Sequence, residues 1–365
     1  MQTLVINRQD GNITKSLSGK DHISGLLFLK DNLEDLPEAL ATTPYAPCSS
    51  PKSMEALGIV AESAEGYQIT EALRTCPGIT LWIGFALRTD QLDAVSSMQH
   101  AASGNIRQLG IMDSETEVSK AAITALQTQA TALDNEWMPL SIILAPKVSS
   151  LGSLPKDLAA SAPNVSVLIS RDSEASEPAL GTLIGTLAAR SVNESIAWVQ
   201  ECETGLTSPV FSDGTPYSEV DKARLEELDE ARYIYLRTYP SLNGVYFSDS
   251  HNMAAASSDY NSIETERTMD KAVRGTRTYL LPELGRPLYF NSDGTLRADT
   301  LQHLRTVAGK AVEDMERAGE VSGWKVDIDP AQDVLGTSTV EFTIQAVPVG
   351  IMRRATVNIG YTKSL

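Results

Sequence analysis

Five near-continuous apolar runs dominate the first half of the chain. They span residues 23–29, 79–87, 106–111, 140–144 and 165–169. Runs of this length are typical of strands that are covered on both faces, as in parallel sheets. Segments with helical spacing of apolar residues, at 92–102, 118–133 and 179–189, alternate with them. Because alternating strands and helices form crossover units, the pattern predicts a sheet flanked by helices.

The last of these helical segments carries Gly181 and Gly185, four residues apart. In a soluble helix this spacing favours close packing against a neighbouring helix over a dimer motif.

The second half reads as a separate region of helices followed by alternating strands. Residues 261–277 predict a helix with Ile263, Met269 and Val273 facing inward. Residues 299–318 predict a longer helix that Asp299 caps. Its predicted buried face consists of Leu301, Leu304, Ala308, Ala311 and Met315. Residues 339–347 then alternate apolar and polar side chains, as half-buried strands do, so the fold class is α/β with mixed sheets.

Both ends of the chain carry short β-prone runs beyond a turn signal. Leu4, Val5 and Ile6 precede one turn, and Val357, Ile359 and Tyr361 alternate beyond Pro348 and Gly350. Two pairings are open for each run, with its own domain or with the sheet edge of another chain. The sequence is therefore divided into an amino-terminal arm (1–20), two α/β parts (21–210 and 211–350) and a carboxy-terminal arm (351–365).

The net charge of the chain argues against one class of partner, nucleic acids. The chain holds 30 Lys and Arg against 47 Asp and Glu, a formal net charge of −17. Nucleic-acid binding needs a basic footprint, so no nucleic-acid partner is expected. The ends are basic, at +2 for residues 1–20 and +3 for residues 351–365, where Arg353 and Arg354 lie. The segment between them carries −22.

The cysteine spacing and the amino-terminal sequence indicate a protein of a reducing compartment. The three cysteines, Cys48, Cys76 and Cys202, are widely spaced, which predicts neither a disulfide framework nor a zinc site. The first twelve residues show no signal-peptide pattern, and the longest mostly apolar run has nine residues. A bilayer span needs ~20, so no membrane insertion is expected. We expect the chain to be made in the cytoplasm.

Candidate chemistry is sparse. The sequence lacks a dinucleotide fingerprint, a phosphate loop and a nucleophile elbow, and its four histidines are scattered. The best metal candidates are Asp327, Asp329 and Asp333, which the sequence places at a strand end. The prediction is no catalytic residue, no metal and no cofactor. A metal-dependent α/β enzyme that uses these three acids stays open as an alternative.

The order of several segments resembles the contractile phage tail sheath family, which includes phage tails, R-type bacteriocins and related contractile injection systems. The matching segments are Ser53–Ile59, Ile69–Ile83, Gln99–Ile111, Val167–Asp172, Gly181–Trp198, Gly244–Ser250 and Asp259–Lys271. The resemblance covers most of the chain from about residue 50 onward, and the first twenty residues match only in character.

The resemblance implies a structural subunit rather than an enzyme. Such subunits polymerise around an inner tube and contract to drive it through a target envelope. Their partners are further copies of the same chain, the inner tail tube protein, and the baseplate and tail terminator proteins. Their terminal arms add strands to a neighbour's sheet, which would assign that role to Leu4, Val5, Ile6 and to Arg353, Arg354, Val357, Ile359 and Tyr361.

The inner tube contacts the carboxy-terminal part of such sheaths. This makes the helix at 299–318 the candidate contact, through Arg305, Lys310 and Arg317. A non-contractile ring or terminator protein of a tail is a second alternative that the sequence leaves open.

Overall fold

The computed structural model describes residues 17, 19–32, 37–41, 44–159 and 161–362. The chain divides into two compact units, residues 1–274 and 275–365. The boundary predicted between residues 210 and 211 lies inside the first unit, and the functional division that it marks stays a prediction. Leu4, Val5 and Ile6 lie outside the described residues.

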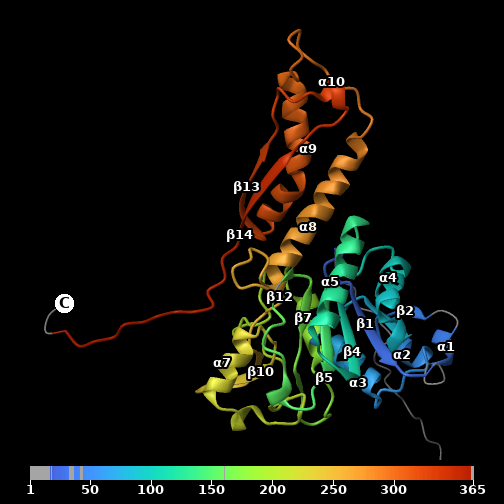
Figure 1. Cartoon of the computed structure of the whole chain (residues 1–365), viewed down its shortest axis with the longest axis vertical. Helices are drawn as coiled ribbons and strands as arrows, with labels where there is room; N and C mark the ends of the chain where they lie inside the picture. The colour runs from blue at the N-terminus through green and yellow to red at the C-terminus, as the bar shows by residue number, and fades with distance from the viewer. Residues whose placement is uncertain (1–16, 18, 33–36, 42–43, 160, 363–365) are drawn as a thin grey trace, which may run out of the picture. The chain divides into compact units, whose positions relative to one another are not determined.

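A six-stranded sheet organises the first unit, in the order β2-β3-β1-β4-β5-β7 (Figure 1). The strands are β1 (Ser24–Lys30), β2 (Tyr45–Cys48), β3 (Leu81–Leu87), β4 (Gln108–Glu117), β5 (Ser141–Lys147) and β7 (Val165–Val167). All neighbours pair in parallel except β2, which runs antiparallel to β3. Each of the five apolar runs forms a strand, so the predicted sheet is confirmed.

The two outer strands of this sheet are its shortest. Strand β2 has four residues and includes Pro47, which has no backbone N–H to donate. Strand β7 has three residues. The four inner strands have seven to ten residues each.

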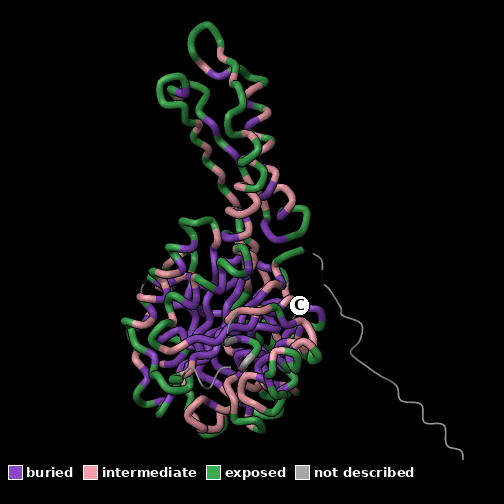
Figure 2. The backbone as a smooth tube through the Cα atoms, turned by 90° about the vertical axis from the view of Figure 1, so that its right-hand side faces the viewer, coloured by how far each residue is buried: buried purple, intermediate pink, exposed green. Residues whose placement is uncertain are grey.

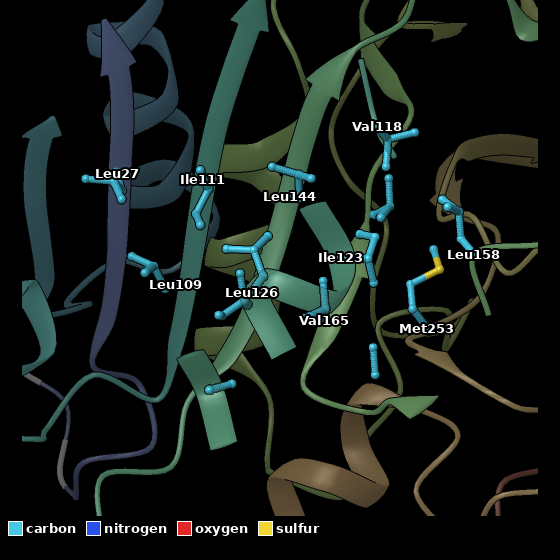
Figure 3. Packing of buried hydrophobic residues seen from close by; sticks show 14 of the residues in the cluster. Leu27, Leu109, Ile111, Val118, Ile123, Leu126, Leu144, Leu158, Val165 and Met253 are labelled. Atoms are coloured by element: carbon cyan, nitrogen blue, oxygen red, sulfur yellow. The ribbon is translucent and has the colours of Figure 1, made fainter. Parts of the chain in front are cut away.

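Helices cover both faces of the sheet. The helices of the first unit are α1 (Glu38–Ala41), α2 (Pro51–Ala56), α3 (Ala64–Thr75), α4 (Gln91–Ala101), α5 (Lys120–Asn135), α6 (Leu180–Ala189), α7 (Lys222–Glu230) and the first part of α8 (Ile263–Leu280). Helices α4 and α5 pack on one face, where Leu126 of α5 lies against Ile111 and Leu144 (Figure 3). Helices α3 and α6 share a second apolar cluster on the other face. Buried chain concentrates in this sheet (Figure 2).

Helices α3 and α6 cross with almost no space between their backbones. A Cβ atom on Gly181 would lie 2.1 Å from the carbonyl oxygen of Gln68, and one on Gly185 would lie 2.8 Å from Cβ of Thr75. Gln68 spans the contact, since its Oε1 accepts from Gly181 N at 2.7 Å and its Nε2 donates to the Pro178 carbonyl at 2.9 Å. The close packing predicted from the glycine spacing is confirmed.

Three short antiparallel pairs complete the strands of the first unit. They are β6 (Ser161–Ala162) with β12 (Met253–Ala254), β8 (Ser170–Asp172) with β9 (Pro209–Phe211), and β10 (Leu236–Tyr239) with β11 (Leu242–Phe247). Single 3₁₀ turns occur at Arg88–Asp90, Leu151–Ser153 and Tyr217–Glu219.

Helix α8 confirms the predicted helix but corrects its inward face. Ile263 is buried and Val273 is partly buried, whereas Met269 is 37% exposed. Three charged residues that the prediction did not include, Glu264, Arg267 and Asp270, are buried along with Ile263 and Ala272. Because these buried side chains are ionic, no apolar stripe marks them, and the prediction was right for Ile263 and wrong for Met269.

The second unit packs one long helix against a hairpin. Its elements are the end of α8, a 3₁₀ turn at Leu281–Glu283, α9 (Ala298–Arg317), β13 (Val321–Asp327), α10 (Val334–Thr337) and β14 (Thr343–Pro348). All five predicted inward positions of α9 are buried. The predicted cap is wrong, because α9 begins one residue earlier, at Ala298. Arg297 occupies the N-cap position and makes no capping hydrogen bond.

Candidate functional site

The hairpin of the second unit is a two-stranded sheet with open edges. Strands β13 and β14 pair antiparallel from Val321 opposite Pro348 to Asp327 opposite Thr343. Among the described residues, each strand pairs only with the other. Isolated two-stranded sheets are marginal, and an unpaired strand edge offers backbone donors and acceptors to another chain.

Helix α9 holds one face of this hairpin through an indole ring. A Cβ atom on Gly309 would lie 2.4 Å from the ring of Trp324, so the helix glycine makes room for the ring. The Trp324 Nε1 donates to the Glu316 carboxylate at 3.0 Å. These contacts fix the hairpin while leaving its strand edges uncovered.

Beyond the hairpin, residues 351–362 form neither helix nor strand (Figure 1). The strand predicted at residues 356–361 is therefore not formed within the chain. Val357, Ile359 and Tyr361 alternate along this segment and are exposed, Ile359 by 92%. Arg353 and Arg354 are also exposed. This alternation is that of a strand, and no partner strand for it is found in the part of the chain that the structure describes.

The three cations predicted on α9 do not form one positive patch. Lys310 Nζ lies 2.8 Å from an oxygen of Asp314 and 3.2 Å from one of Glu313. Arg317 pairs with the same two acids. The hydrogen bond from Lys310 holds the pKa of the Asp314 carboxyl below its usual range. Arg305 stands apart, partly buried, with Nη2 3.5 Å from the carbonyl oxygen of Ile328.

An exposed apolar loop of the second unit was missed by sequence reasoning. Leu281, Leu284 and Tyr289 lie around Gly285 and are more than half exposed, Leu284 by 75%. Glu283 lies between them and accepts from Arg286 and from His303 at 2.8 Å each. The hydrogen bond from Arg286, followed by that from His303, lowers the pKa of Glu283. The only sequence signal was an apolar run broken by proline and glycine, which does not distinguish a buried loop from an exposed one.

The three candidate metal ligands, Asp327, Asp329 and Asp333, contact residues close to them in the sequence. Asp327 pairs with Lys325, Asp329 accepts from the backbone of Ala331 at 2.8 Å, and Asp333 caps α10. Within the described ranges, no three His, Cys, Asp or Glu side chains are grouped so as to hold a metal ion.

Two general features concern the whole of the described chain. Its three cysteines are free and buried, and burial raises the pKa of each thiol. None of its helices has both the length and the apolar character needed to cross a membrane.

Comparison with known sequences gives one family for both parts of the chain. Residues 30–251 match the domain described as "DUF2586, N-terminal domain", and residues 259–365 match "DUF2586, C-terminal domain". A putative tail sheath protein of Haemophilus phage HP1 is 25% identical over 150 residues. That match covers 39% of each chain, so our chain spans about two fifths of the length of this relative.

Solved structures show the same fold along the full length of the chain. The contracted helical sheath of the anti-feeding prophage superimposes with a TM-score of 0.67 at 13% identity, covering 100% of this chain and 99% of the other. The contracted sheath complex of the extracellular contractile injection system PVC gives 0.65 at 11% identity, covering 100% and 98%. A chain of the anti-feeding prophage baseplate gives 0.62 at 14% identity, covering each chain fully.

The resemblance to contractile tail sheath proteins predicted from segment order is confirmed by these matches. The protein belongs to the DUF2586 family and has the fold of the sheath proteins of contractile injection systems.

Proposed function

We propose that this protein is the sheath subunit of a contractile tail, which polymerises around an inner tube and contracts to drive that tube through a target envelope. The observation that carries the proposal is the likeness to the contracted anti-feeding prophage sheath over the whole chain. The partial match to a putative phage tail sheath protein supports the same role. The subunit would belong to a phage tail or a phage-like contractile particle and act structurally rather than as an enzyme.

The polymer would be linked by strand exchange between copies. The open edges of β13 and β14 offer a template, and Val357, Ile359 and Tyr361 of a neighbour supply a strand of the right alternation. Leu4, Val5 and Ile6 would serve a second such junction. Main-chain hydrogen bonds give such a junction its strength, and alternate apolar side chains set its register.

Charge favours contact between copies through the second unit. Residues 275–365 hold ten Lys and Arg against eleven Asp and Glu, so the surplus acid of the chain lies almost entirely in the first unit. Without the arm, residues 275–350 hold seven Lys and Arg against eleven Asp and Glu, so a strand junction at β13 and β14 would bring a basic arm of +3 to an acidic body of −4. Arg353 and Arg354 would add attraction toward an acidic neighbour.

Further partners follow from the role itself. The inner tube would lie against α9, where Lys310 and Arg317 form a mixed-charge face with Glu313 and Asp314 and Arg305 stands apart from them. The baseplate and the terminator would bind the two ends of the polymer. The likeness to a chain of the anti-feeding prophage baseplate complex supports a sheath that reaches the baseplate.

Electron microscopy of the purified full-length protein, with negative stain, tests the polymer. We expect hollow striated cylinders. Discrete rings would instead support the alternative of a non-contractile ring or terminator protein. Soluble single copies under all assembly conditions, with or without inner tube, would refute the sheath assignment.

Deletion of residues 352–365 tests the carboxy-terminal junction separately. The truncated chain should keep the circular dichroism spectrum and melting temperature of the full chain and fail to form cylinders. The matched control is a full-length chain in which Thr356, Asn358 and Thr362 are replaced by serine, which keeps the apolar alternation. Unchanged assembly of the truncated chain would remove residues 352–365 from the junction.

A further inference from the structure

The root of α8 buries charged groups. Glu264, Arg267 and Asp270 are each less than a tenth exposed, and Arg267 is 2% exposed. Glu266 is partly buried beside them. All four belong to the part of α8 that lies in the first unit. Buried charge is costly unless it is paired, so this arrangement needs a reason beyond filling space.

Polar groups from the strand entries of the sheet meet this helix. Asp21 precedes β1, Arg107 precedes β4 and Asn164 precedes β7. The Asp21 carboxylate accepts from Lys271 Nζ at 2.6 Å and lies 4.0 Å from a guanidinium nitrogen of Arg274. Helix α8 is therefore fastened along the edge where the parallel strands begin.

Glu266 connects α8 to α5 through an amide. Its Oε1 accepts from Asn164 Nδ2 at 3.0 Å, and Asn164 Oδ1 accepts from Gln127 Nε2 of α5 at 2.7 Å. The backbone N–H of Asn164 donates to Gln127 Oε1 at 3.0 Å, so the amide pair is doubly bonded. The carboxyl of Glu266 thus ends a short chain of hydrogen bonds between two helices.

Glu266 and Asp270 lie four residues apart, on the same face of α8. The charged groups that act on the pair are Asp134 from α5, Arg107 from the entry of β4, and Arg267 and Arg274 from α8 itself. The closest cation to Asp270 is Arg274, at 4.0 Å, beyond hydrogen-bond distance. Burial raises the pKa of both carboxyl groups above their usual range. Repulsion from Asp270 and Asp134 raises the pKa of Glu266 further, while the hydrogen bond from Asn164 lowers it. At Asp270 the charge of Arg274 opposes the rise, Asp134 adds to it, and Arg107 and Arg267 oppose it.

We propose that α8 is held to the first unit by a proton-dependent anchor, in which Glu266 and Asp270 retain protons at mildly acidic pH, where free carboxyls are ionised, and the root of the helix loosens when both give them up to water. Protonated, each carboxyl is neutral, so its burial costs less and the repulsion between the two groups is absent. Ionised, the pair and Asp134 place three like charges together in a partly dehydrated site.

The direction of the effect follows from proton linkage. The anchored form binds protons more tightly than the opened form, whose carboxyls titrate near pH 4. Protonation therefore stabilises the anchor fully below about pH 4, and this stabilisation is lost as the pH rises through the raised pKa values of the anchored form. Each proton released on opening raises the opening equilibrium about ten-fold per pH unit within that window.

This inference does not depend on assembly, since every group in it belongs to one chain. Asp270 lies four residues before the last residue of the first unit, and α8 continues to Leu280 in the second. The anchor therefore governs the order of the helix that connects the two units covalently.

Hydrogen exchange of the full chain, read by mass spectrometry on peptides within residues 263–274, tests the proposal. After correction for intrinsic exchange rates, the protection of these peptides should fall at least ten-fold between pH 5.5 and pH 8.5, while peptides of β4 and β5 should change less. In the double variant Glu266→Gln, Asp270→Asn, which mimics the protonated pair, this pH dependence should disappear.

The matched control is Glu226→Gln, Glu230→Gln, which changes the same charge at the same spacing on the exposed face of α7. It should behave as the unmodified chain. If the double variant does not fold, Glu266→Gln alone decides, with at least half of the logarithmic pH response expected to be lost. Protection that is independent of pH in the unmodified chain, or equally dependent in the amide variants, would overturn the proposal while leaving the sheath assignment untouched.

Discussion

Replacing Gly181 by alanine probes the crossing of α3 and α6 with a single methyl group. The added carbon would lie 2.1 Å from the carbonyl oxygen of Gln68 and 2.8 Å from its Cα. Carbon–oxygen contacts settle near ~3.3 Å, so the helices would have to separate by roughly 1 Å. Separation would also stretch the hydrogen bond between Gln68 Oε1 and Gly181 N, now 2.7 Å long.

Three effects set the size of the loss. Alanine in place of glycine gains about 1 kcal/mol of helix propensity. Overpacking costs about 1–3 kcal/mol, and weakening a buried hydrogen bond costs about 1–3 kcal/mol more. The net expectation is a loss of about 3 kcal/mol in the free energy of unfolding, or a melting temperature lower by about 6–12 °C.

Two further glycines calibrate this measurement. At Gly185 the nearest atoms lie at 2.8 Å and 2.9 Å, so Gly185→Ala should cost less than Gly181→Ala. At Gly323, in β13, no atom lies within 4 Å, so Gly323→Ala should be neutral or slightly stabilising. Urea denaturation followed by circular dichroism should give this order. A Gly181→Ala chain as stable as the original would mean that the two helices do not cross as closely as described.

Three other outcomes are expected. Reversing Arg353 and Arg354 to glutamate should weaken cylinder formation most at low ionic strength, where screening is least. Sedimentation of the polymer at a series of salt concentrations measures this. If cylinder formation is indifferent to salt, strand pairing alone holds the arms. Tyr67→Phe removes the donor to Asp172 Oδ2, now 2.7 Å away, and should cost about 1.5 kcal/mol in urea denaturation, with no loss if water replaces the bond. Calorimetric titration with magnesium, manganese or calcium should give no binding heat, and a saturable heat would reopen the metal-enzyme alternative for the acids after β13.

The main sheet could be predicted because its strands are buried on both faces. A strand covered by helices on both sides needs apolar residues at nearly every position, and such runs are visible without any alignment. The single antiparallel strand β2 was not predicted, since four residues containing Pro47 carry no such pattern.

Helix α3 was missed for a different reason. Its buried positions include Gly66, Gln68 and Glu71, so it lacks an apolar stripe. Their burial is compensated by partners far along the chain, such as Thr182, whose hydroxyl lies 2.9 Å from Glu71 Oε2. Hydrophobic periodicity reveals positions where apolar side chains are buried. It does not reveal polar or charged side chains whose burial is compensated by hydrogen bonds. The same limit hid the charged face of α8.

The candidate junction was predictable only as a pattern. The alternation of Val357, Ile359 and Tyr361 identifies a strand, but a strand forms only where a partner edge exists. Among the described residues, the segment pairs with no strand edge of its own chain, so it has no strand structure there. The predicted tube contact on α9 was limited in a similar way. Lys310 and Arg317 were identified as cations from the sequence, without the acidic side chains that neutralise them in the structure.

The short outer strands of the main sheet reduce the risk of aggregation when many copies of the chain lie close together. Where many copies of a chain are held at high local concentration, any long open edge would invite wrong pairings and tangled aggregates. Strand β2, with four residues and a proline, and strand β7, with three residues, offer few backbone hydrogen bonds to a strand of another copy. Within the described part of the chain, the main sheet therefore offers little edge for wrong pairing, whereas β13 and β14 of the hairpin, with seven and six residues, offer longer edges for a specific partner strand.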